Sequence, residues 1–137
     1  MRTAAMIAAL ETHTALSPLR LALRVDAVVT GANGVAYLAA ATVLDDVLGP
    51  TAGFLRAIGV FLLVFTAGVW AVSVPDRPAP AAVDAVVLAN VVWVGASVAL
   101  VLTEWQHLTT VGVVWVLLQA VVVGAFAAAQ GWALTRR

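Results

Sequence analysis

Amide side chains interrupt the long apolar stretches of this sequence. Asn33, Asn90 and Gln119 each lie well inside such a stretch, and Thr66 lies inside another. An amide carries hydrogen-bond donors and an acceptor, so it can bind a polar solute or another side chain. An unpaired amide in apolar surroundings costs several kcal/mol. We therefore expect these four residues to face inward and to form a single central polar layer.

Helical spacing extends this layer along one face of each stretch. Asp26, Thr30, Asn33 and Tyr37 follow one another at intervals of four, three and four residues, and Gln130 shares a face with Gln119. Aromatic side chains on the same faces would supply apolar walls. The predicted ligand-binding residues are Asn33, Asn90, Gln119, Tyr37, Trp93, Thr30 and Thr66. Hydrogen bonding between helices, or between two subunits, is the alternative role of the amides.

Two aspartates are candidates for proton coupling. Asp26 and Asp84 each lie near the start of an apolar stretch, and a carboxyl group partly withdrawn from water binds a proton more readily than one in water. The alternative is that a nearby arginine neutralises each of them. For Asp26 that arginine would be Arg20 or Arg24, and for Asp84 it would be Arg77.

The sequence carries no sign of an enzyme or of a bound cofactor. It has no HExxH, GxSxG or nucleotide-binding motif. Cysteine is absent, which excludes disulfides, thiolate catalysis and cysteine-bound metals. The expected positions of His13 and His107 on opposite sides of a membrane argue against a haem held by both. We therefore expect no cofactor, no metal and no catalytic residue, although enzymatic activity stays open.

The composition places the chain in a lipid bilayer. Its 137 residues are 64% hydrophobic and 10% charged, whereas soluble domains carry about 25% charged residues. A transmembrane helix needs about 20 apolar residues, so there is room for four spans and short loops. With a formal net charge of +0, the chain has no basic patch typical of nucleic-acid binding.

Four apolar runs predict an all-α, antiparallel four-transmembrane-helix bundle. Turn signals separate the runs, and the absence of strict alternation argues against strands. The runs are Ala27–Leu44, Gly53–Val74, Ala81–Leu102 and Leu108–Leu134. We expect one domain over residues 1–137, in which residues 1–19 form a short cytoplasmic or interfacial segment.

That N-terminal segment has two interpretations. A signal peptide is disfavoured because Glu11, Thr12 and His13 occupy the place of a cleavage site. A short interfacial helix would turn Met6, Ile7 and Leu10 toward lipid. We expect the second arrangement.

The arginines predict the orientation. Six of the seven fall on one side of the expected spans, and the opposite side collects acidic residues. The positive-inside rule then places both termini in the cytoplasm. High Ala, Val and Arg usage with no lysine suggests a GC-rich bacterial genome, so we expect the cytoplasmic (inner) membrane of a bacterium. The arginines on that side are Arg2, Arg20, Arg24, Arg77, Arg136 and Arg137, and the one exception is Arg56.

The pentapeptide VDAVV occurs twice, at Val25–Val29 and at Val83–Val87. Each copy opens an apolar run, and an asparagine follows its aspartate by six or seven residues. We interpret the repeat as a duplicated helical hairpin. Chance repetition in a chain rich in Ala and Val is the alternative.

Two functions of different classes follow. The first is a small bacterial membrane protein that binds or passes a small polar or amphipathic solute, as a homodimer or larger assembly. The second is a non-enzymatic accessory or assembly subunit of a larger membrane complex. The partners expected are the bilayer, a second copy or another membrane protein, and a small-molecule or lipid ligand. An intramembrane enzyme acting on a lipid or isoprenoid would require a carboxylate such as Asp26 to open into the cavity.

Overall fold

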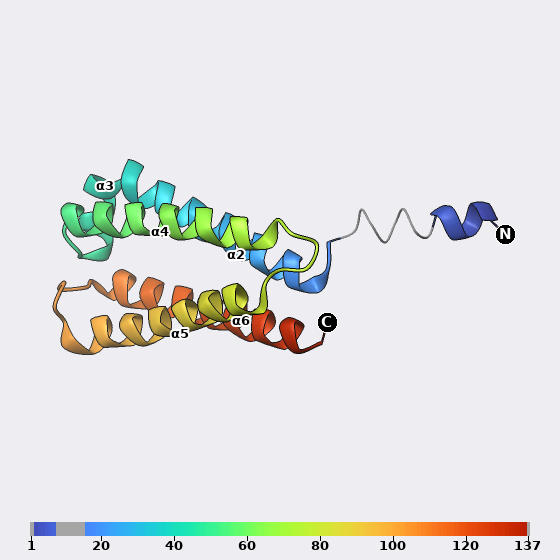
Figure 1. Cartoon of the computed structure of the whole chain (residues 1–137). Helices are drawn as coiled ribbons and strands as arrows, with labels where there is room; N and C mark the ends of the chain where they lie inside the picture. The colour runs from blue at the N-terminus through green and yellow to red at the C-terminus, as the bar shows by residue number, and fades with distance from the viewer. Residues whose placement is uncertain (1, 8–15, 137) are drawn as a thin grey trace.

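The chain is all-helical over residues 2–7 and 16–136, which are the residues that the computed structural model describes. Residues 2–7 form a short helix, and Leu10 of the expected interfacial helix lies outside the described residues. The main helices are α2 (Pro18–Ala39), α3 (Ala41–Leu48), α4 (Ala52–Ser73), α5 (Pro80–Thr103) and α6 (Thr110–Thr135). Figure 1 shows the four long helices side by side, with α3 at one end.

Three of these helices, α4, α5 and α6, are each long and apolar enough to cross a membrane. The pair α2 and α3 meets the same test together but is bent by 98°, so the described chain has three or up to four candidate spans. The apolar helices indicate a multi-pass membrane protein. The predicted bounds of the last three runs agree with α4, α5 and α6 to within two residues.

The prediction for the first helix was wrong at both ends. It was expected to begin at Ala27, but α2 begins at Pro18, where the Ser17 hydroxyl accepts a hydrogen bond from the Arg20 amide (3.2 Å). The helix therefore also takes in two residues of the expected N-terminal segment. It was expected to run on to Leu44, but it breaks at Ala40, whose φ and ψ are −120° and 22°.

The arginines near the start of α2 explain the difference. Arg20 donates to the carbonyls of Ser73 (2.9 Å) and Val74 (3.0 Å) at the end of α4, where carbonyls lack helical partners. Arg24 donates to the Ser73 hydroxyl (3.2 Å) and lies over the ring of Trp70 (4.7 Å). Both arginines thus belong to the helix rather than to a preceding loop.

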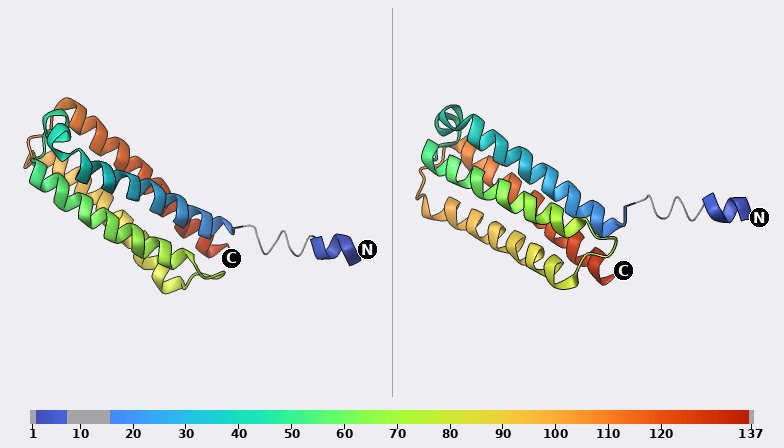
Figure 2. Two further views of the ribbon diagram at one scale, coloured as in Figure 1. Left: turned by 90° about the horizontal axis from the view of Figure 1, so that it is seen from above. Right: turned by 45° about the horizontal axis from the view of Figure 1, so that its top comes forward.

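The four long helices form two pairs. α2 packs extensively on α4, and α5 packs on α6, while α4 and α5 barely contact each other. Two glycines bring the first pair together, because a Cβ atom on Gly59 would lie 2.9 Å from the carbonyl oxygen of Gly34. The views in Figure 2 show the two pairs lying along one another, and contacts between α2 and α6 join them.

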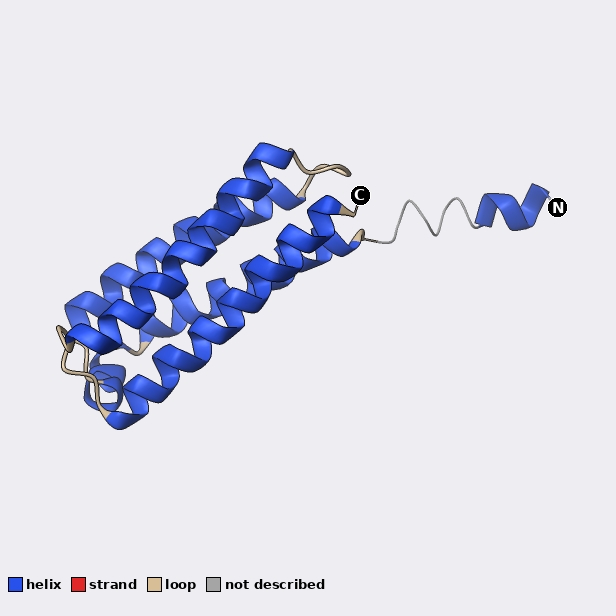
Figure 3. Cartoon of the chain, turned by 90° about the horizontal axis from the view of Figure 1, so that it is seen from below, coloured by secondary structure: helices blue, strands red, loops and turns tan. Residues whose placement is uncertain are grey.

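The chain ends and the α4–α5 loop lie at one end of the helices, while α3 and the α5–α6 loop lie at the other, as Figure 3 also shows. At the α3 end, Thr109 donates through its amide to the Leu48 carbonyl (3.0 Å) and through its hydroxyl to Val47. Gly112 of α6 lies so close to Leu48 that a Cβ atom there would overlap its carbonyl oxygen. The break at Ala40 thus lets α3 fold down onto α6.

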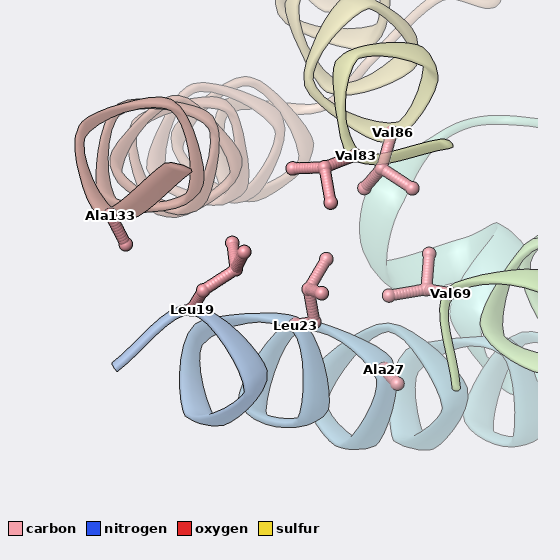
Figure 4. Packing of buried hydrophobic residues seen from close by; sticks show 7 residues of the cluster. All are labelled: Leu19, Leu23, Ala27, Val69, Val83, Val86 and Ala133. Atoms are coloured by element: carbon pink, nitrogen blue, oxygen red, sulfur yellow. The ribbon is translucent and has the colours of Figure 1, made fainter. Parts of the chain in front are cut away.

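Two hydrophobic clusters fill the interior. The cluster at the terminal end, drawn in Figure 4, consists of Leu19, Leu23, Ala27, Val69, Val83, Val86 and Ala133. The cluster at the α3 end consists of Tyr37, Ala41, Leu48, Leu55 and Leu62. The polar side chains of the interior lie between and beside these two clusters.

The two VDAVV copies occupy different positions in the fold. Asp26 lies eight residues after the start of α2 and is buried, whereas Asp84 lies four residues after the start of α5 and is exposed. The expectation that both copies open the first helix of a hairpin was therefore wrong for the first copy. The structure gives no support to an internal repeat.

Candidate functional site

A buried polar cluster joins α2, α5 and α6. The Oδ2 atom of Asp26 accepts hydrogen bonds from Asn90 Nδ2 (2.9 Å) and Gln130 Nε2 (2.7 Å). Its Oδ1 atom lies 2.9 Å from the Thr30 hydroxyl, and Asn90 Nδ2 also donates to Gln130 Oε1 (3.1 Å). Asp26 and Gln130 are 0% exposed and Asn90 is 3% exposed. We call these four residues the carboxylate cluster.

Sequence reasoning found only part of this cluster. Asn90 and Thr30 were predicted to bind ligand and Asp26 to exchange protons, but Gln130 was named only as a member of a helix face. The sequence spacing could have identified Gln130 as an inward-facing residue. Gln130 follows Gln119 by eleven residues, which is about three helical turns, so the two amides share a face of α6.

A second set of polar contacts lies nearer to the α3 end. Trp93 Nε1 donates to Gln119 Oε1 (2.7 Å), and Gln119 Nε2 donates to the Ser97 hydroxyl (2.9 Å). Trp115 Nε1 donates to the hydroxyl of Tyr37 (2.7 Å). The expected single layer is therefore two layers, with Asn90 in one and Gln119 in the other.

A small chamber of about 50 Å³ lies between the two layers. Its lining includes five of the seven predicted ligand-binding residues, from α2, α5 and α6: Thr30, Asn33, Asn90, Trp93 and Gln119. Liquid water occupies about 30 Å³ per molecule, so the chamber is of water size. Asn33 is half-buried, and no hydrogen bond of its side chain is found within residues 16–136.

A larger cavity of about 320 Å³ lies on the other side of Trp93 and Gln119. Its walls come from both helix pairs and include the rings of Tyr37, Phe54, Trp93, Trp105 and Trp115. Binding pockets for small molecules typically measure about 300–1,000 Å³ and are mostly apolar with few polar groups. We call this space the aromatic cavity.

Trp93 and Gln119 line both spaces and separate them. The Trp93 ring also stacks on Phe61 of α4, with ring centroids 5.9 Å apart and planes inclined by 5°. This side-chain partition thus reaches across α4, α5 and α6. It holds the aromatic cavity apart from the water-sized chamber.

The remaining predicted residues lie elsewhere. Thr66 is outside both spaces, because its hydroxyl donates to the Ala27 carbonyl (3.1 Å) on the outer side of the α2–α4 contact. Asp84 is exposed. Neither Arg20 nor Arg24 neutralises Asp26, since both bind the end of α4.

An intramembrane enzyme would need a carboxylate that opens into the cavity, and Asp26 does not meet this requirement. Its side chain is fully buried and is not among the residues that line the chamber or the aromatic cavity. No catalytic role follows from this position.

No protein-family model matches the sequence, and neither a curated protein nor a solved structure matches the chain.

Proposed function

We propose that this chain is a protein of the bacterial cytoplasmic membrane that binds a small amphipathic molecule in its aromatic cavity. In this proposal α4, α5, α6 and the bent pair α2 and α3 form four spans, and both termini lie in the cytoplasm. The observation that carries the proposal is the aromatic cavity of about 320 Å³ between the two helix pairs.

The lining of the cavity favours an apolar body with one hydrogen-bond acceptor. Most of the surrounding side chains are aromatic or aliphatic. The Tyr37 hydroxyl accepts from Trp115, and within the described residues its own proton has no acceptor. By contrast, Ser97 and Gln119 already donate to neighbours. Thr103 and Trp105 also line the cavity, but both are exposed, whereas Tyr37 is buried. Tyr37 is therefore the group that we expect to bind the polar part of the ligand.

The place of the cavity favours entry from the lipid. It is lined by α4 and α5, the two neighbouring helices that barely contact each other. An amphipathic molecule dissolved in the bilayer would pass between them without crossing the polar loops. This route predicts a ligand that partitions into membranes.

Native mass spectrometry of protein gently extracted from its own membrane tests the proposal. The wild-type protein is expected to retain a small molecule. Ala96→Phe adds a ring at the wall of the cavity and should abolish retention, whereas Ala125→Phe on α6, which lines neither the chamber nor the cavity, should preserve it. Tyr37→Phe should weaken retention about tenfold through the loss of one hydrogen bond. Unchanged retention in Ala96→Phe would contradict this site.

The weak α4–α5 contact also suits the alternative function as an accessory subunit, because a helix of a partner could cover it. Native mass spectrometry also distinguishes the ligand-binding protein from the accessory subunit. Stoichiometric co-purification with another membrane protein, with no small molecule retained, would favour the accessory subunit. A homodimer would appear as a species of twice the chain mass. Single cysteines placed at Arg77 and Glu104 of this cysteine-free chain would test the orientation by their labelling from the two sides.

A further inference from the structure

Asp26 is a buried carboxylate with no cation beside it. Its side chain is 0% exposed, and the one ion pair within residues 2–7 and 16–136 joins Arg20 to Asp76 (3.4 Å). A charged group in the membrane interior is costly unless it is paired. The carboxylate cluster supplies three hydrogen bonds to Asp26 but no positive charge.

The charged groups on the surrounding helices are all directed elsewhere. On α2 itself, Arg24 lies over Trp70 and Arg20 binds the end of α4. On α4, Arg56 is exposed in the half near α3. On α5, Asp84 is exposed. Arg136, which follows α6, lies over the ring of Trp132 (5.1 Å). The nearest groups to Asp26 are therefore neutral donors.

The geometry of the cluster suits both protonation states of Asp26. A hydroxyl group rotates, so Thr30 can donate to the Oδ1 atom of a carboxylate or accept from the same oxygen when it carries a proton. The 2.9 Å separation of these atoms serves either bond. Asn90 and Gln130 donate to Oδ2 in both states. No heavy atom has to move when the proton binds.

Thr30 also connects Asp26 to the chamber between the two polar layers. It lines the chamber of about 50 Å³, which has room for a water molecule with polar partners. Asn33 and Gln119 line the same chamber. A proton can therefore reach Asp26 through the Thr30 hydroxyl, although Asp26 itself does not line the chamber.

From these contacts we infer that Asp26 is a reversible proton-binding site inside the membrane, with Thr30 as the group that relays the proton. The proton adds to Oδ1 and converts the carboxylate to a neutral carboxylic acid, and Thr30 turns from donor to acceptor. Asn90 and Gln130 are positioning residues that hold the carboxyl group. This site stands independently of the aromatic cavity, because Asp26 lines no part of it.

Infrared spectroscopy of the protein in lipid vesicles tests this inference as the pH is lowered. A carboxylic acid in apolar surroundings gives a C=O stretching band that a carboxylate lacks. Wild type and Asp84→Asn are both expected to develop this band, and Asp26→Asn should lose it. The amide of Asp26→Asn can donate to Thr30 and accept from Asn90 and Gln130, so the variant mimics the neutral state. The same band in Asp26→Asn and wild type would overturn the proposal.

A second pair of variants keeps the test decisive if Asp26→Asn does not fold. Thr30→Val removes the hydroxyl that passes the proton, so the band should appear more slowly after a drop in pH than in wild type. Thr30→Ser keeps the hydroxyl and should leave the rate unchanged. Equal rates in all three proteins would overturn the relay. Ligand retention in Tyr37→Phe does not enter this readout, so the two proposals fail separately.

Discussion

The two VDAVV segments have the same five residues and opposite environments. Asp26 is buried within the carboxylate cluster, whereas Asp84 is exposed. A helix turns by about 100° per residue. Asn33 follows Asp26 by seven residues and therefore lies on the same face, but Asn90 follows Asp84 by six and lies about 120° away. Because Asn90 faces the interior, Asp84 must face outward.

The number of helical residues before each copy also differs. Eight residues of α2 precede Asp26, and they include Leu19 and Leu23 of the terminal hydrophobic cluster. Only four residues of α5 precede Asp84. The same short sequence is thus placed more than two turns deep in one helix and about one turn deep in the other. The burial of the aspartate is therefore decided by where the helix begins and by which face of the helix the residue occupies, and not by the five-residue sequence around it.

The largest effect is expected when each aspartate is truncated. Asp26→Ala removes the acceptor of three hydrogen bonds and leaves amide donors of Asn90 and Gln130 unpaired, which should lower the free energy of unfolding by about 2–4 kcal/mol. Asp84→Ala should change it by no more than about 0.5 kcal/mol. Reversible unfolding in bicelles measures both. An equal loss of unfolding free energy in the two variants would contradict the contrast between a bonded, buried Asp26 and an exposed Asp84.

The two asparagines provide a smaller contrast of the same kind. Asn90→Leu removes a buried amide that donates to Asp26 and Gln130, and it should cost about 1–2 kcal/mol. Asn33→Leu, at the wall of the chamber, should cost less than about 0.5 kcal/mol. The measurement is again the free energy of unfolding. A larger loss for Asn33→Leu would show that Asn33 is the better-bonded amide.

The smallest effect concerns the residue four positions after each aspartate. Thr30→Val should cost about 0.5–1 kcal/mol because Asp26 loses one donor. The matching residue of the second copy is the exposed Leu88, and Leu88→Thr should change stability by no more than about 0.5 kcal/mol. A clear increase of the free energy of unfolding in Leu88→Thr would contradict this expectation, because the new hydroxyl would then form the same hydrogen bond to Asp84.

The later helices could be predicted from the sequence because hydropathy and turn residues mark both their ends. Gly53–Val74 was expected, and α4 is Ala52–Ser73. The first helix was misplaced because Arg20 and Arg24 were taken as residues that precede it. Their hydrogen bonds to the end of α4 depend on tertiary structure, which hydropathy does not register. No glycine or proline lies next to Ala40, so the sequence gives no sign that the helix breaks there.

The site could be predicted only in part, for a related reason. Helical period placed Asn90, Trp93 and Gln119 inward, and these residues do line the interior spaces. The helical period does not tell how far along the bundle a residue of one helix lies relative to a residue of another, so the one expected polar layer is in fact two. The period also does not tell which neighbouring helix a face contacts. Thr66 therefore binds the backbone of α2 and not the polar layers.

Asp26 of α2 and Gln130 of α6 are held together inside the protein. A double-mutant cycle of Asp26→Ala and Gln130→Ala, followed by reversible unfolding in bicelles, measures this contact. We predict a coupling free energy of about 1 kcal/mol or more, with no coupling between Asp84→Ala and Gln130→Ala. Additivity of Asp26→Ala and Gln130→Ala within about 0.3 kcal/mol would contradict the contact.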